Sequence, residues 1–145
     1  MLRNRSVPAD TVLPHIVYTD LPRALAWLSA VFGFVERYRY GDVEAGQGGA
    51  QMRLGAACIM LHGARAGENS PAACGASTQS LTVFVEDVEG HYARAKAAGA
   101  KITETPHETI YGEFQYGAED VEGHHWLFSR HARDVNPEEW GAKRA

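Results

Sequence analysis

Apolar positions recur along this chain with two periods, one typical of strands and one typical of helices. Alternation of apolar and polar residues predicts strands, and apolar residues three or four positions apart predict a helix. In the first half of the chain Asp20 stands as an N-cap, Pro22 in a first helical turn, and Gly33 at a helix end. The pattern therefore predicts strand, helix and three further strands at residues 11–19, 21–32, 35–40, 50–54 and 56–62.

The same order of elements returns in the second half. A helix is expected between the N-cap Asp87 and Gly99, with strands at 81–85, 100–105, 114–119 and 124–129. The offset is nearly constant, since 67 residues separate Asp20 from Asp87 and 68 separate Gly55 from Gly123. A constant offset indicates an internal duplication. We therefore predict a single domain over residues 1–145, divided into module 1 (about 11–63), a linker (about 64–79), module 2 (about 80–131) and a C-terminal tail (132–145).

The last predicted strand divides into two faces. After Gly123, the residues His124, Trp126 and Phe128 share one face, and His125, Leu127 and Ser129 share the other. The aromatic face suits packing on a helix, while the mixed face suits a pocket lining. The predicted fold class is α+β, with two tandem βαβββ modules forming a paired, barrel-like open sheet around a central cavity.

Composition narrows the classes of partner. The formal net charge is −4 and the basic residues are scattered, which argues against nucleic acid. No apolar run approaches the roughly 20 residues of a membrane span, and the basic N-terminus has no apolar core behind it to make a signal peptide. Cys58 and Cys74 form no disulfide framework or zinc-finger spacing. We therefore expect a cytoplasmic protein with no nucleic-acid or membrane partner.

Several short segments resemble the vicinal oxygen chelate superfamily, which includes glyoxalase I, bleomycin resistance proteins and extradiol dioxygenases. They are VYTDL (17–21), VFGF (31–34), LG (54–55), VEDV (85–88), AGA (98–100) and EDVEGHHWLF (119–128). The resemblance covers about residues 13–130, and YGEFQY at 111–116 resembles an uncharacterised glyoxalase-like subgroup. It implies a cavity between the two modules and a homodimer, which the open sheet edges also favour.

Metal-dependent members of that superfamily hold one divalent ion with ligands from the first and last strand of each module. Carried onto this chain, those positions are Leu13, Ser80, Ile59 and Leu127. Three are apolar and the fourth is a weak ligand, so we expect no metal and no other cofactor. A shift of one residue at Pro14 would reverse the face of its neighbours, including His15.

The candidate ligand-binding residues follow from the same register. His15 and His125 are placed facing the cavity, as ligand contacts, proton acceptors or a displaced metal site; the alternative is a histidine bonded to a neighbour. Thr82 and Phe84 share the parity of Ser80 and suit a flat organic ligand, with core packing as the alternative. The remaining candidates are Leu127, Tyr111 and Gln115; the hairpin positions of Tyr111 and Gln115, like those of Arg53 and Glu113, do not fix which face each occupies. The other histidines, His62, His91, His107 and His131, are expected in solvent.

Three functions stay open at this point. The first is metal-independent binding of a small organic ligand in the cavity, with no catalytic residue assigned. The second is a superfamily enzyme, a lyase, isomerase or dioxygenase, which uses a displaced divalent metal or no metal. The third is a structural module with a filled cavity. The fold by itself selects none of these, because one scaffold hosts unrelated chemistries.

Overall fold

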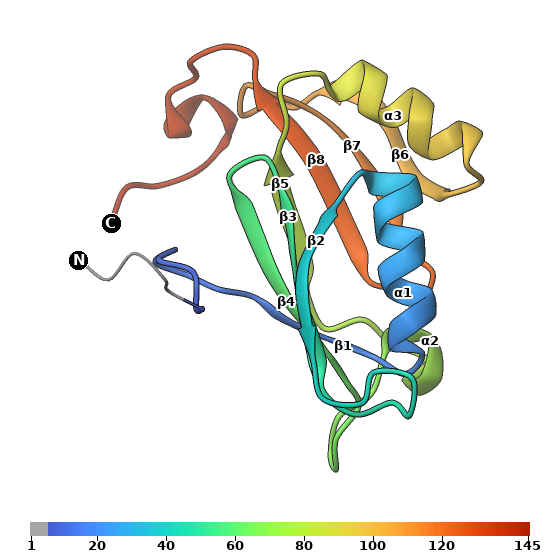
Figure 1. Ribbon diagram of the computed structural model, residues 1–145. Helices are drawn as coiled ribbons and strands as arrows, with labels where there is room; N and C mark the ends of the chain where they lie inside the picture. Colours follow the sequence, from blue (N-terminus) through green and yellow to red (C-terminus); the bar gives the residue numbers. More distant parts are fainter. Residues whose placement is uncertain (1–5) are drawn as a thin grey trace.

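The computed structural model describes residues 6–145 and contains two four-stranded sheets (Figure 1). Sheet A has the strand order β1-β4-β3-β2 and sheet B the order β5-β8-β7-β6. In each sheet the first strand pairs in parallel with the last, and the other pairs are antiparallel. The strands are β1 (His15–Tyr18), β2 (Val35–Tyr40), β3 (Gly49–Leu54), β4 (Ala57–Gly63), β5 (Ser80–Phe84), β6 (Lys101–Glu108), β7 (Glu113–Glu119) and β8 (His125–His131). The α+β class and the two βαβββ modules are confirmed, and the sheets are open rather than closed barrels.

The helices begin and end where the predicted caps lie. Helix α1 (Leu21–Trp27) continues as the π-helical turn η1 (Leu28–Phe32), and Gly33 ends it with φ 81°. Helix α3 (Val88–Ala97) begins after Asp87, whose side chain accepts a hydrogen bond of 2.9 Å from Gly90 N. The segment predicted as a linker contains the short helix α2 (Pro71–Cys74), and the tail contains the 3-10 turn η2 (Pro137–Trp140).

β1 and β6 differ most in length from the prediction. β1 begins only at His15, because Pro14 has no N–H to donate to a ladder; its carbonyl instead accepts a hydrogen bond from Met60 N at 2.9 Å. The residues before it lie beside sheet A, where the Ser6 carbonyl accepts a hydrogen bond from the Tyr38 hydroxyl. β6 extends to Glu108 with two register irregularities, which an edge strand containing a proline tolerates.

Both modules contribute to one hydrophobic core. Phe32 of η1 packs on Phe128 and Trp126 of β8, at ring-centroid distances of 4.8 and 5.8 Å. Sheet A adds Ile16, Met52 and Leu61 to the same cluster. In Figure 1, α1 lies next to β8 of the second module. The helix-facing sides of the two sheets thus meet in the core, and each sheet turns its other side away from it.

Two buried carboxylates in the β7–β8 turn connect the modules. Asp120 accepts hydrogen bonds from the Tyr18 hydroxyl (2.6 Å) and from Trp126 Nε1 (3.0 Å). Glu122 accepts from the backbone N and the hydroxyl of Thr19, both at 2.7 Å. Burial, followed by the neighbouring Asp120, raises the pKa of Tyr18 well above its usual value, so this hydroxyl stays protonated and able to donate. Within residues 6–145 no helix is long and apolar enough to cross a membrane.

Candidate functional site

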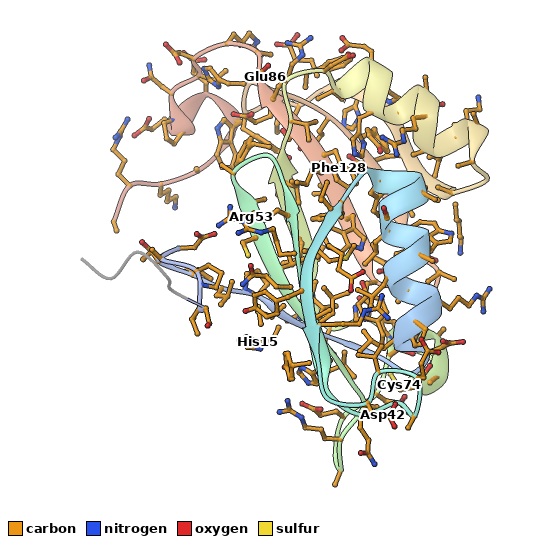
Figure 2. The ribbon with its side chains drawn as sticks, viewed as in Figure 1. His15, Asp42, Arg53, Cys74, Glu86 and Phe128 are labelled. Carbon is orange, nitrogen blue, oxygen red and sulfur yellow. The ribbon has the colours of Figure 1, made fainter. Side chains whose placement is uncertain are left out.

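The side of sheet A away from α1 is here called face A. It carries basic, amide, aromatic and apolar side chains. One row across the four strands contains His15, Met60, Gln51 and Tyr38, paired in that order. The next row contains Cys58, Arg53 and Val35. The Gln51 amide donates to the Tyr38 hydroxyl at 3.1 Å, which orders the centre of the face. In Figure 2, His15 and Arg53 lie to the left of sheet A while α1 lies to its right.

The corresponding side of sheet B, here called face B, brings five of the predicted residues together. Thr82 pairs with Leu127, and Leu127 pairs with Gly117. Phe84 pairs with Ser129, which pairs with Gln115. The predicted residues on this face are His125, Leu127, Thr82, Phe84 and Gln115. Their alternation with the buried Trp126 and Phe128 is the one that the sequence pattern predicts.

Face B carries polar side chains near both edges, with Leu127 and Phe84 as apolar residues among them. His125 Nε2 lies 3.1 Å from Glu119 Oε1, and Gln115 donates to Glu104 at 2.9 Å. Near the β5 edge, Phe84 is 69% exposed and Thr82 is also exposed, so neither packs in the core of the chain. An exposed phenylalanine beside hydroxyl and amide groups is the arrangement that an aromatic ligand would contact.

Tyr111 lies outside both faces, in the loop between β6 and β7. Its hydroxyl donates to Gln115 Oε1 at 3.4 Å, and its ring makes an edge contact with Trp140 at 5.8 Å between centroids. The C-terminal tail therefore rests on the loop next to Gln115. Tyr111 reaches the predicted site only through Gln115.

Three pockets lie at the margins of the faces. A pocket of about 570 Å³ lies between β1, the linker and the start of β8, and its lining includes His15, Val17, Glu68, Cys74, Gln79 and His124. His125 lines a pocket of about 280 Å³ beside the linker, and Thr82 lines one of about 240 Å³ with Cys58 and Pro14. The predicted residues of a single chain are thus distributed over several recesses.

The metal positions carried over from the superfamily do not offer a ligand set. Leu127 lies on face B, but Ile59 pairs with the buried Met52 and lies on the helix side of sheet A, not on the cavity side. The β3–β4 turn has two residues between Leu54 and Ala57, whereas the β7–β8 turn has five between Glu119 and His125, so equal counting from the turn glycines reverses the face. Among the described residues no group of three or more His, Cys, Asp or Glu side chains is placed to hold a metal ion.

Of the histidines expected in solvent, His62 is buried and His91 is half-buried. His62 is 5% exposed, and its Nε2 lies 3.1 Å from Glu68 Oε1. His91 of α3 donates from Nε2 to the Phe32 carbonyl at 2.8 Å, and its Nδ1 accepts from the Tyr116 hydroxyl at 2.5 Å. Burial lowers the pKa of His91, which favours the neutral ring that this pair of hydrogen bonds requires. The prediction failed for His91 because its partners Phe32 and Tyr116 are distant in sequence. It failed for His62 because its partner Glu68 lies in the predicted linker.

Comparisons with known proteins agree with this architecture. A family model described as Glyoxalase/Bleomycin resistance protein/Dioxygenase superfamily matches residues 10–128. The uncharacterized protein Mb0911c of Mycobacterium bovis is 28% identical over 137 residues, which cover 87% of this chain and 86% of that protein.

Solved structures of similar fold support the same architecture. TioX from Micromonospora sp. ML1 is 31% identical, with a TM-score of 0.66 over 85% of this chain and 99% of TioX. TnmS3, an antibiotic binding protein from Streptomyces sp. CB03234, is 17% identical with a TM-score of 0.66 over 89% of this chain and 100% of TnmS3. Because the family model spans both modules, the chain belongs to the glyoxalase/bleomycin resistance protein/dioxygenase superfamily.

Proposed function

We propose that this protein binds a small organic ligand between face A and face B, without a metal ion. The observation that carries the proposal is the common placement of His125, Leu127, Thr82, Phe84 and Gln115 on face B, away from the core. Face A supplies His15 and the polar row beside it. An exposed aromatic ring next to hydrogen-bonding groups offers a flat ligand both a stacking surface and polar contacts.

The site is complete only when a second copy of the chain is present. In one chain the helix sides of both sheets meet in the core, so face B points outward. Face A points away from the core as well, but only its margins, with His15, Tyr38 and Val35, are open, because Gln51, Met60 and Cys58 at its centre are buried and Gln51 donates to the Ser6 carbonyl at 3.4 Å. Their charges differ: face A carries the cation of Arg53, while face B carries Glu104, Glu113 and Glu119 against one lysine, Lys101, which is paired with Glu119 at 3.2 Å. Opposite charge favours a contact between face A of one copy and face B of another. The ligand would lie between them in a homodimer.

The relatives are consistent with this class of function. TnmS3 is described as an antibiotic binding protein. At 17% identity that likeness speaks for the fold, and the ligand class of this chain rests on its own residues. The recess volumes of about 240–570 Å³ overlap the range of about 300–1,000 Å³ usual for small-molecule sites.

A fluorescence titration with N-phenyl-1-naphthylamine, a neutral aromatic probe, tests the proposal. Phe84→Ser should weaken probe binding about tenfold, because a buried aromatic contact is worth on the order of 1–2 kcal/mol. Ile110→Ser is the matched control, since Ile110 is 66% exposed, close to the 69% of Phe84, but lies in the β6–β7 loop. Equal loss in both variants, or no saturable binding by the wild type, would contradict the proposal.

Sedimentation velocity tests the dimer. A single dimeric species across the micromolar range is expected, and Phe84→Asp should shift it toward monomer because it replaces an apolar ring at the interface by a charge that the dimer would have to desolvate. A wild type that is monomeric throughout that range would remove the homodimer, and with it the shared site.

The enzymatic alternative keeps one supporting observation. His125 and Glu119 form a histidine–carboxylate pair on face B, an arrangement that orients an imidazole as a proton acceptor. If His125→Gln abolished conversion of a ligand while leaving its binding unchanged, the protein would be an enzyme of this superfamily rather than a binding protein.

A further inference from the structure

Arg53 is the cation of face A and is held firmly in place. Its backbone pairs with Val35 of β2 on one side and with Cys58 of β4 on the other, so it lies on an inner strand of sheet A. Met52 and Leu54 before and after it point to the helix side, which fixes Arg53 on face A. Figure 2 shows Arg53 on the side of the sheet opposite α1.

The guanidinium of Arg53 has no partner among residues 6–145. Its Nε is buried and makes no hydrogen bond in the described part of the chain. Among the other arginines, Arg39 is paired with Glu36, Arg130 with Glu89 and Arg133 with Glu108, while Arg23, Arg37 and Arg65 are exposed to solvent. Arg53 as a whole is half-buried, and a buried donor such as its Nε is unfavourable when left unpaired, which favours a partner from outside the chain.

The electrostatic surroundings of Arg53 favour an anion. The pKa of the nearby Cys58 thiol is raised mainly by burial and next by the charge of Asp10, while Arg53 and Arg37 act to lower it. A planar guanidinium offers paired donors that match the oxygens of a carboxylate, phosphate or sulfonate.

The groups around Arg53 define the rest of the ligand. Cys58 and Val35 are its neighbours across the strands, and Met60 and Tyr38 belong to the adjacent row. These side chains are apolar, polarisable or aromatic. A ligand that matches them would carry an apolar or aromatic body next to its charged group.

We propose that Arg53 is the specificity-determining residue of the site and that the ligand is an organic anion, with a carboxylate, phosphate or sulfonate group on an aromatic or apolar body. This inference rests on the proposed function, because it assigns the charge of a ligand bound between faces A and B.

Two fluorescent probes that differ by one anionic group test it. 8-Anilinonaphthalene-1-sulfonate carries a sulfonate on the same aromatic frame as N-phenyl-1-naphthylamine, which carries none. Arg53→Gln should weaken binding of the sulfonate probe by about 10–100-fold, the range expected for loss of a charge-assisted hydrogen bond. It should change the affinity for the neutral probe less than about twofold. Arg53→Lys should recover part of the loss, because lysine keeps the charge without the fork of donors.

Arg39→Gln is the matched control. It removes one positive charge from the same sheet, but at an exposed side chain already paired with Glu36 at 2.6 Å. It should leave the ratio of the two probe affinities unchanged. Melting temperatures of both variants, measured without probe, establish that the sheet is intact.

The outcomes separate this inference from the proposed function. If the wild type binds neither probe, the ligand-binding function fails and the role of Arg53 fails with it. If it binds both and Arg53→Gln alters neither, only the anion assignment is overturned. If Arg53→Gln dissociates the dimer without changing the ratio of probe affinities, the partner of Arg53 is a carboxylate of the second copy and the assignment is likewise overturned.

Discussion

Replacing the buried Asp120 with asparagine isolates the contribution of one carboxylate to the joining of the two modules. Its Oδ1 accepts from the backbone N of Glu122 (2.9 Å) and of His124 (3.0 Å), and its Oδ2 accepts from the Tyr18 hydroxyl (2.6 Å) and Trp126 Nε1 (3.0 Å). Asparagine has the same shape but only one acceptor oxygen. An amide facing the aromatic pair can donate to the Tyr18 hydroxyl, but it leaves the indole N–H unpaired.

The expected loss of unfolding free energy for Asp120→Asn is about 2–4 kcal/mol. One buried donor left unsatisfied costs about 1–3 kcal/mol, and the remaining hydrogen bonds lose the strengthening that a charged acceptor gives. Urea denaturation at fixed protein concentration, followed by tryptophan fluorescence, measures it. Asp134→Asn is the control: the Asp134 side chain is fully exposed, and the change should stay within about 0.5 kcal/mol.

Tyr18→Phe completes a double-mutant cycle with Asp120→Asn. It removes one donor and should cost about 1–2 kcal/mol alone, with less effect once the carboxylate is gone. A loss below about 1 kcal/mol for Asp120→Asn, or additive losses in the double variant, would refute the view that this carboxylate holds the modules together.

Three further predictions concern other parts of the molecule. Burial lowers the pKa of His91, so the unfolded state takes up the His91 proton before the folded state as pH falls below about 6.5. The unfolding free energy, measured from pH 8 to 5, should therefore decline with acid, and the decline should be shallower in His91→Gln. Gly112→Ala should cost about 1–3 kcal/mol in urea denaturation, because φ is 89° there and an added Cβ would meet the Arg133 carbonyl oxygen; a cost near zero would contradict this. Adding Zn²⁺, Ni²⁺, Mn²⁺ or Fe²⁺ to chelator-treated protein should leave the melting temperature unchanged, and a rise that His15→Ala or His125→Ala removes would establish a displaced metal site.

The parts of the fold whose sequence signals lie within a few residues could be predicted from the sequence. Asp20 and Asp87 mark both helices, and the alternation after Gly123 assigns the two faces of β8 correctly, because each signal is contained within a few residues. The candidates His125 and Leu127 fall on face B for that reason. Their role in binding stays a prediction.

The parts that depend on distant contacts could not be predicted. The sequence pattern places His91 on the surface of its helix, but in the folded chain it contacts Phe32 and Tyr116 from other elements. Ile59 was assigned to the cavity side because the two turn glycines were treated as equivalent, whereas the turns differ in length. The unpaired state of Arg53 has no local signal either, since it depends on which carboxylates the fold brings near.

The bond between Glu122 and Thr19 also bears on the order in which the chain folds during synthesis. The two residues are 103 positions apart, so the turn that precedes α1 lacks its acceptor until the β7–β8 turn has been made. At synthesis rates of about 5–20 residues per second, the first module waits roughly 5–20 s for that contact. Meanwhile Phe32 has neither Trp126 nor Phe128 to cover it. Until that contact forms, the first half of the chain exposes apolar surface of the kind that chaperones bind.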